Sequence, residues 1–252
     1  STLAELRRLD DLSPAALPLV PGNPRLGPPV AGTRKIIAMG FNYADHAEES
    51  DVALPPEPLL FSKAVTALSG PYDEVVAPRG HTMLDYEVEL VIVIGRTARY
   101  VAEADALEYV AGFTVGHDVS ERHFQNRRGG QFVKGKSADT FAPVGPWLVP
   151  THHVENVQAL RIRSWVNGEP RQDSDTRYMV FGAAFAVSYI SQFMTLQPGD
   201  LIFTGTPAGV GAGMEPPRWL EPGDVVELEI QHPGRQRQHI APPPPDGAVG
   251  QR

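Results

Sequence analysis

Cysteine is absent from all 252 residues of the chain. Disulfide bonds, zinc sites built on thiolates and cysteine nucleophiles are therefore excluded. An excess of positive charge is also absent, because 22 lysines and arginines are outnumbered by 30 aspartates and glutamates, for a formal net charge of −8. Nucleic acid and anionic membranes are therefore not expected as main partners, and an anionic substrate would have to be held by a local cation.

Long hydrophobic runs are missing as well. The longest apolar stretch, residues 178–194, is interrupted by Gly182, Ser188, Ser191 and Gln192. It therefore predicts a buried amphipathic helix rather than a membrane span. The sequence shows no signal-like N-terminal segment. We expect a soluble, cytoplasmic protein.

Helical periodicity is scarce, whereas turn-forming residues are abundant, with 25 prolines and 24 glycines. This profile is typical of a sheet-rich α+β domain with a few short helices. Strands are predicted at residues 35–39, 59–63, 74–77, 84–94, 110–118, 147–149, 160–166, 201–204 and 225–230. Helices are predicted at 43–50 and at 177–195, the second with Asp173, Ser174 and Asp175 as capping candidates.

The predicted organisation has three parts. Residues 1–33 are rich in proline and are expected to form an irregular N-terminal arm after one helical turn at 3–8. Residues 34–231 are expected to form the catalytic domain. Residues 232–252 include four consecutive prolines and are expected to form a flexible tail.

Three dipeptides predict the type of turn that they form. Asn167-Gly168 is the strongest short signal for a β-hairpin. Pro198-Gly199 and Pro222-Gly223 fit the two central positions of type II turns. Structure accounts for these repeated Pro-Gly turns, and we infer no chemistry from them.

Three carboxylates predict a cation site. Glu87 and Glu89 lie two residues apart in one predicted strand, and Asp118 ends the next apolar segment. Since side chains alternate along a strand, the two glutamates share a face with Val91 and Val93. A solvated face should stay polar along its length, so this pattern places the pair at the mouth of a buried pocket. The alternative from these residues alone is an acidic edge strand in solvent.

Residues 130–137 match the phosphate-loop pattern G-x-x-x-x-G-K-S. That motif binds phosphate only where a strand precedes it and a helix follows. Here Pro143 and Pro146 come soon after the pattern and leave little room for a helix. We therefore reject nucleotide hydrolysis, and Lys136 requires another explanation.

Six short motifs occur together in a fixed order: GFNYADH (40–46), YEVEL (86–90), DVSERHFQ (118–125), GKS (135–137), VNGE (166–169) and TGTPAGVG (204–211). On these motifs the chain, over about residues 34–231, resembles the fumarylacetoacetate hydrolase family. It is similar to the compact members, because the arm is far shorter than the N-terminal domain of the large fumarylacetoacetases. The compact members include acylpyruvate and diketo-acid hydrolases, oxaloacetate decarboxylases and isomerases of aromatic catabolism.

The resemblance implies a mixed β-roll of the type formed by the C-terminal domain of this family, a homodimer, and one Mg²⁺ or Mn²⁺ per subunit. Glu87, Glu89 and Asp118 would hold the metal. Three carboxylate oxygens without a thiolate suit such a hard ion. The implied partner is a small anionic keto acid with a pyruvate-like end.

The resemblance also implies four residues that contact this substrate. Lys136 and Arg122 match the cationic positions of the family, and Gln125 and Thr206 match its polar contacts. Arg122 can bind a carboxylate through two hydrogen bonds, whereas Lys136 acts as a point charge. From the sequence alone, Arg122 could instead lie on the surface of a helical turn, and Thr206 could be a turn residue.

His46 and Glu49 are three residues apart on a predicted helix and therefore share a face. In compact family members such a pair lies on a segment that orders when substrate binds, and it polarises a water molecule. The carboxylate would fix the tautomer of the imidazole. Glu48 could replace Glu49 in this role, and an ordinary surface pair is the structural alternative.

The leading hypothesis is Mg²⁺-dependent hydrolysis of a C–C bond in a 2,4-dioxo acid, an acylpyruvate. The same head-group chemistry would serve decarboxylation of a β-keto acid such as oxaloacetate, isomerisation of a 2-hydroxy-dienoate, or dehydration of a keto acid. A different class of protein is a non-catalytic domain stabilised by Ca²⁺. Such a domain would explain the carboxylates but neither Lys136 and Arg122 nor the pair of His46 and Glu49.

Overall fold

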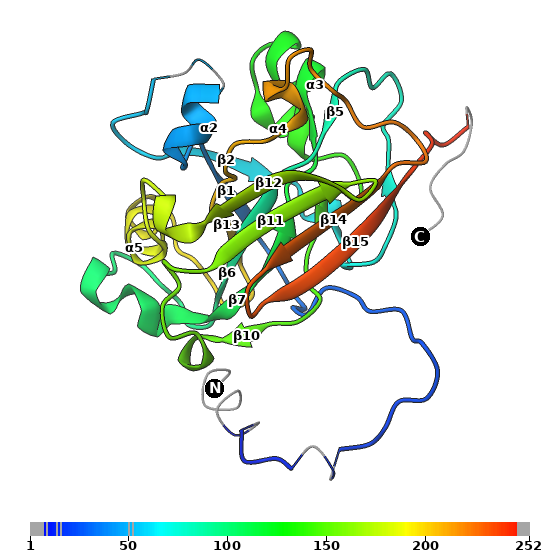
Figure 1. Ribbon diagram of the computed structural model, residues 1–252. Helices are drawn as coiled ribbons and strands as arrows, with labels where there is room; N and C mark the ends of the chain where they lie inside the picture. The colour runs from blue at the N-terminus through cyan, green and yellow to red at the C-terminus, as the bar shows by residue number, and fades with distance from the viewer. Residues whose placement is uncertain are drawn as a thin grey trace.

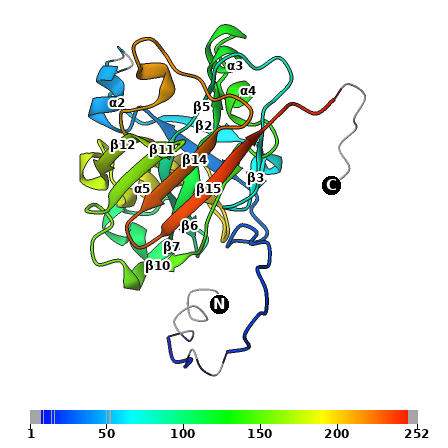
Figure 2. The ribbon, with the colours of Figure 1, turned by 45° about the vertical axis from the view of Figure 1, so that its right-hand side comes forward.

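Two β-sheets form the body of the protein (Figure 1). The computed structural model describes residues 8, 10–13, 15, 17–49, 51 and 53–245. Strands β6 and β7 of one sheet lie against β11, β14 and β15 of the other, and the apolar core lies between them (Figure 2). The predicted sheet-rich α+β fold is confirmed.

The first sheet has six strands. Its spatial order is β10 (Val149–Pro150), β7 (Val110–His117), β6 (Val88–Ile94), β13 (Leu201–Phe203), β1 (Ile36–Gly40) and β2 (Leu59–Lys63). Strands β1 and β13 are parallel, and the other neighbours are antiparallel. Every residue of β6 and β7 is buried, as expected for central strands covered on both faces.

The second sheet has five strands, in the order β12 (Glu169–Asp175), β11 (Arg161–Val166), β14 (Val225–Ile230), β15 (Gly234–Ala241) and β4 (Val75–Val76). Buried and partly exposed residues alternate along β14, so Val226, Leu228 and Ile230 face the core. Two short pairs complete the strands: β3 (Leu68–Ser69) with β9 (Ala142–Pro143), and β5 (Leu84–Asp85) with β8 (Ser120–Glu121).

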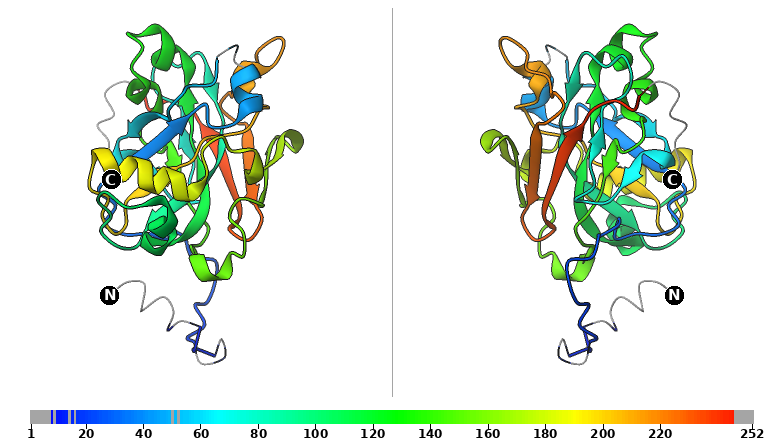
Figure 3. Two further views of the ribbon diagram at one scale, coloured as in Figure 1. Left: turned by 90° about the vertical axis from the view of Figure 1, so that its left-hand side faces the viewer. Right: turned by 90° about the vertical axis from the view of Figure 1, so that its right-hand side faces the viewer.

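The helices are short. Those bounded by described residues are α2 (Ala44–Glu49), α3 (Arg122–Arg127), α4 (Phe132–Lys136) and α5 (Ala183–Phe193), with 3₁₀ turns η2 (Val65–Ala67), η3 (Glu103–Tyr109), η4 (Thr151–His153), η5 (Thr176–Tyr178) and η6 (Gly211–Gly213). Helix α5 lies on the side of the six-stranded sheet that faces away from β14 and β15 (Figure 3). None of the helices in the described ranges is long and apolar enough to cross a membrane.

The predicted turns are confirmed. Asn167 and Gly168 both have positive φ angles, 53° and 80°, and they join β11 to β12. These angles match the type I′ turn, which fits the twist of a two-residue hairpin. Gly199 and Gly223 have φ angles of 88° and 102°, as the third residue of a type II turn requires.

Most predicted elements differ by one or two residues from the observed bounds, and two elements differ more. The strand predicted at 84–94 is interrupted at Tyr86 and Glu87, because β5 pairs with β8 while β6 pairs with β7. The helix predicted at 177–195 begins at Ala183. Before it, the backbone N–H of Val180 donates to the carbonyl of Asn42, and Asp175 caps η5 instead of α5.

The prediction of a flexible tail from residue 232 onward is wrong, because Gly234–Ala241 forms β15 inside the second sheet. The inward side chains of Gln236 and Gln238 are fully buried. Gln238 donates to the carbonyl of Pro71 and lies 3.0 Å from Nδ1 of His117. These polar partners make burial of Gln238 possible, and its Nε2 also donates to Oε1 of Gln236 at 2.8 Å. The helical turn predicted at 3–8 and residues 246–252 lie outside the described residues, except for Arg8.

Candidate active site

The two central strands of the first sheet bring the predicted carboxylate triad together. Glu87 precedes β6, Glu89 is its second residue, and Asp118 follows β7 directly. The antiparallel register pairs Val88 with His117, so all three side chains meet at one end of the strand pair. One carboxylate oxygen from each residue lies within 4.8 Å of the other two, and all three residues are buried. The alternative of a solvated acidic edge strand is therefore wrong.

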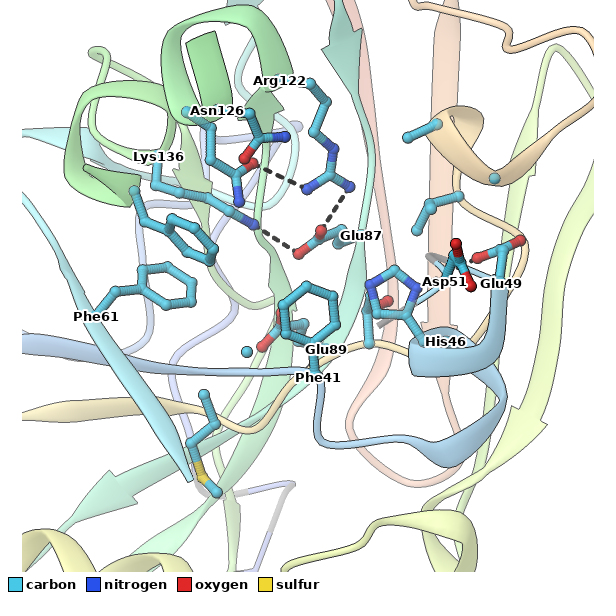
Figure 4. A pocket seen from close by; sticks show the side chains of 18 residues that line it. Phe41, His46, Glu49, Asp51, Phe61, Glu87, Glu89, Arg122, Asn126 and Lys136 are labelled. Carbon is cyan, nitrogen blue, oxygen red and sulfur yellow. Dashed lines mark hydrogen bonds and ion pairs between the residues drawn. The ribbon is translucent and has the colours of Figure 1, made fainter. Parts of the chain in front are cut away.

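Three cations surround two of these carboxylates, and Figure 4 shows two of the three, Lys136 and Arg122, beside Glu87. Nζ of Lys136 lies 2.8 Å from Oε2 of Glu87 and 2.7 Å from Oδ2 of Asp118. Nη2 of Arg122 lies 2.6 Å from Oε1 of Glu87, and Lys63 forms an ion pair with Asp118. Burial opposes ionisation of Glu87, but the charges of Lys136 and Arg122 outweigh it and hold the pKa of Glu87 below its ordinary value.

Glu89 is different, because no cation of the described residues forms an ion pair with it. Its Oε2 accepts a hydrogen bond of 2.7 Å from the backbone N–H of Gly205. Burial raises the pKa of Glu89 well above its ordinary value, and the charges of Asp118 and Glu87 raise it further. A buried carboxylate without a cation fits a site that binds a divalent metal. The oxygen-only donor set suits Mg²⁺ or Mn²⁺.

The charges of the whole cluster also fit a dication. The carboxylates of Glu87, Asp118 and Asp85 are in contact with three cations, Lys63, Arg122 and Lys136, so these charges balance. The buried carboxylate of Glu89, once ionised, leaves one negative charge over. A bound dication would turn it into one positive charge, which would attract an anionic ligand although the protein as a whole is acidic.

The residues predicted to contact substrate line the same cavity, which has a volume of about 490 Å³. Arg122 is the first residue of α3, and its Nη1 donates to Oε1 of Gln125 at 3.2 Å. Arg122 is only 9% exposed, so the alternative of a surface residue is wrong. The hydroxyl of Thr206 donates to the carbonyl of Val88 and accepts from Gln172, so Thr206 also fixes the glycine-rich loop.

His46 and Glu49 face the cavity from α2. Nδ1 of His46 lies 3.2 Å from Oε2 of Glu49, and the imidazole stacks on the ring of Phe41. The other oxygen of Glu49 accepts from the backbone N–H of Gly209 at 2.9 Å. Glu48 is exposed and has no place in the pair. Both side chains are therefore held, and no described residue hydrogen-bonds to Nε2 of His46, which is free to contact a ligand.

The phosphate-loop pattern has a structural explanation. Helix α4 packs tightly on α3, since a Cβ atom on Gly135 would lie 2.5 Å from the carbonyl oxygen of Glu121. Gly135 thus allows the close approach that brings Lys136 to the carboxylates. Residues 137–146 contain no helix, as the two prolines predicted.

Sequence reasoning missed two charged residues of this site. Lys63 ends β2 and is fully covered, and Asp85 ends β5 and pairs with Arg122 at 2.8 Å. A lysine that closes a strand of apolar residues was a weak signal for the first. Asp85 lies two residues before Glu87, but nothing in the sequence pointed to its partner.

Comparisons with known proteins identify the family. The family described as fumarylacetoacetate (FAA) hydrolase C-terminal matches residues 35–241. The chain belongs to the fumarylacetoacetate hydrolase family. The matched residues extend to the end of β15 at Ala241, which supports including this strand in the folded domain.

Individual relatives are enzymes of two kinds. A 2,4-didehydro-3-deoxy-L-rhamnonate hydrolase from Sphingomonas sp. (strain SKA58) is 51% identical over 228 residues, which cover 90% of this chain and 80% of the relative. The fumarylacetoacetate hydrolase from Exiguobacterium antarcticum has a TM-score of 0.84 at 37% identity, covering 96% of this chain and 88% of that one. The 5-carboxymethyl-2-hydroxymuconate delta-isomerase from Mycobacterium smegmatis has a TM-score of 0.77 at 38% identity, covering 88% and 83%.

The protein is therefore an enzyme of a family that contains hydrolases and isomerases. The alternative of a non-catalytic Ca²⁺-stabilised domain is not supported. Members of the family generally bind a divalent metal, and the buried triad of this chain can hold one.

Proposed function

We propose that the protein hydrolyses the C3–C4 bond of a 2,4-dioxo acid that carries a hydroxyl group on its tail. The observation that carries this proposal is the placement of a histidine–carboxylate pair and an anion-binding group around one cavity. Hydrolysis needs the pair and the anion-binding group, because the water molecule that attacks one carbon must lose a proton while negative charge develops at another carbon.

The nature of the substrate is supported by the relative from Sphingomonas. Its name describes a six-carbon acid with oxo groups at C2 and C4, no oxygen at C3 and a hydroxyl at C5. This is a 2,4-dioxo acid, the class indicated by the resemblance. Cavity residues that reach beyond the charged cluster are both polar and aromatic, namely Phe41, Asp51, Phe61, Asn126 and Phe132. A short tail with hydroxyl and methyl groups suits this mixed lining.

The pyruvate-like end would bind at the cationic side of the cavity. Arg122 and Gln125 would hold the carboxylate, and Lys136 would lie near the oxygen at C2. A Mg²⁺ or Mn²⁺ ion held by Glu87, Glu89 and Asp118 would supply Lewis-acid stabilisation of the charge on that oxygen. Lys136 bridges two of these ligands, so it would shift towards the substrate when the ion is present.

The proton transfers would be carried out by His46. Since Nδ1 is tied to Glu49, Nε2 would take a proton from a water molecule that attacks C4. The C3–C4 bond then breaks, its electron pair moves to C3 and the C2 oxygen, and Lys136 stabilises that charge. Return of a proton to C3 gives pyruvate. The C4 fragment leaves as a carboxylic acid, which is lactate for the acid named above.

A second candidate is isomerisation of a 2-hydroxy-dienoate, favoured by the relative from Mycobacterium smegmatis, which is named as an isomerase. Decarboxylation of a β-keto acid such as oxaloacetate would use the same head-group contacts. Neither reaction needs water at a distal carbonyl. The role of His46 therefore separates these candidates from hydrolysis.

The test is a panel of acids incubated with Mg²⁺ and followed by proton NMR. The panel contains a 5-hydroxy-2,4-dioxo acid, a 2,4-dioxo acid without the hydroxyl, oxaloacetate and a 2-hydroxymuconate-type acid. We expect pyruvate from both dioxo acids, with higher kcat/KM for the hydroxylated one. His46→Ala should lower kcat by ~100-fold or more, whereas His152→Ala, an exposed histidine of η4, should have no effect. Turnover of only the dienoate or oxaloacetate would reject the proposal.

A further inference from the structure

Asp85 is a buried carboxylate that the proposed mechanism does not use. Its Oδ2 accepts from Nε of Arg122 at 2.9 Å and from the backbone N–H of Ala212 at 3.1 Å. Its Oδ1 accepts from the backbone N–H groups of Gly211 and Tyr86 at 2.7 and 2.9 Å. These donors occupy the acceptor sites that a carboxylate offers. Asp85 is therefore not available to a metal or a substrate, and its role has to be exerted through its partners.

The loop of residues 209–213, whose backbone binds Asp85, also contacts the side chain of Glu49. The N–H of Gly209 donates to Oε1 of Glu49 at 2.9 Å. A Cβ atom on Gly213 would lie 2.1 Å from Cδ of Glu49, so only glycine leaves room for this carboxylate. The neighbour of Asp85, Tyr86, adds a second anchor, since its hydroxyl donates to the carbonyl of Gly209 at 2.9 Å.

We propose that Asp85 is a positioning residue that couples the two ends of the active site. It fixes Arg122 directly, and it fixes the pair of His46 and Glu49 through the loop of residues 209–213. The kinetic part of this inference rests on the proposed function. The structural coupling does not depend on it.

Asp85→Asn removes the coupling with little change of shape. The Asn side chain has one acceptor oxygen and one NH₂ donor. Arg122 and the loop are both donors, so one of them would face the NH₂ group and lose its hydrogen bond. We expect kcat to fall and KM to rise, each by about 10-fold or more. Glu49→Gln should lower kcat alone, and Arg122→Lys should raise KM alone. If the coupling holds, the effect of Asp85→Asn on kcat is much smaller in a Glu49→Gln background.

Asp200 provides a matched control. It is equally buried, it pairs with Lys35 at 2.7 Å, and it accepts backbone N–H groups of Lys35 and Gln197. It does not line the active-site cavity. Asp200→Asn should therefore lower the melting temperature as Asp85→Asn does, but it should leave kcat and KM unchanged.

Tyr86→Phe is the milder variant if Asp85→Asn folds poorly. It removes only the anchor on Gly209 and does not touch Arg122. We expect a lower kcat with an unchanged KM. An unchanged kcat would contradict the link between the loop and Glu49.

Hydrogen exchange of the free enzyme tests the coupling without any substrate. Backbone amides of residues 209–213 and 44–49 should exchange at least about 10-fold faster in Asp85→Asn than in the wild type and in Asp200→Asn. Faster exchange with no turnover of dioxo acids by the wild type would uphold the coupling and reject the proposed function. Exchange in Asp85→Asn equal to that in Asp200→Asn would overturn the coupling, whatever the substrate.

Discussion

Glu87 and Glu89 lie two residues apart, yet their surroundings give them opposite properties. Glu87 is paired with Lys136 and Arg122, so its charged form is stabilised. Among the described residues, Glu89 has only the N–H of Gly205 as a hydrogen-bond partner, and burial together with the nearby negative charges favours its protonated form. In the absence of metal, the first side chain is expected to stabilise the fold and the second to weaken it at neutral pH.

Matched substitutions test this contrast in EDTA. Glu87→Gln should lower the free energy of unfolding by about 3 kcal/mol, because it leaves buried cations without part of their compensation. Glu89→Gln should keep or raise it, because the amide resembles the protonated acid and still accepts from Gly205. Denaturation with urea at pH 7 measures both. A larger loss in Glu89→Gln than in Glu87→Gln would contradict the assignment.

The raised pKa of Glu89 also predicts how the free energy of unfolding depends on pH. The raised pKa means that folded, metal-free protein keeps a proton on Glu89 that the unfolded chain releases above the ordinary value of 4.5. The unfolded chain then binds fewer protons, so the free energy of unfolding falls as the pH rises from there. The wild type should therefore lose stability relative to Glu89→Gln between pH 5 and pH 8 in EDTA.

At the scale of elements, β15 decides where the folded domain ends. It lies between β14 and β4, and its Arg237 has an exposed side chain while its backbone N–H donates to the carbonyl of Pro71 at 3.1 Å. Backbone and side chain can therefore be tested separately at this position.

Arg237→Pro should lower the free energy of unfolding by at least about 3 kcal/mol, because proline cannot donate within an internal strand. Arg237→Ala should change it by less than about 0.5 kcal/mol, because the side chain is on the surface. Thermal and urea denaturation measure both variants. Equal stability of the two would mean that the segment is a tail after all.

The elements that the sequence predicted well are those whose pattern is local. Strands β2 and β14 have the predicted bounds, because their apolar residues alone determine the buried face. Strand β15 was missed because its buried residues include Gln236 and Gln238, whose burial depends on partners such as His117, far away in the sequence. The start of α5 was misplaced because Asn42 binds the backbone before it.

The candidate site follows the same division. The triad, Lys136 and the pair of His46 and Glu49 lie in short motifs, so the sequence could indicate them. Lys63 meets Asp118 across 55 positions, and Asp85 meets Arg122 across 37. Such contacts depend on how β2 and β5 pack in the finished fold, and no local pattern encodes them.

At the scale of the whole molecule, an acidic protein with a net charge of −8 binds an anionic substrate only if its site supplies positive charge locally. The buried cations of the cluster nearly balance its carboxylates, and a dication would make the cavity positive. The proposed metal site is therefore the feature on which the proposed chemistry depends.

The most direct measurement is a titration with Mn²⁺, in which electron paramagnetic resonance reports the free ion. The wild type should bind one Mn²⁺ per chain, Glu89→Gln should bind it at least ~100-fold more weakly, and Asp200→Asn should bind it as the wild type does. Absence of binding by the wild type, or undiminished binding by Glu89→Gln, would contradict a metal site formed by Glu87, Glu89 and Asp118.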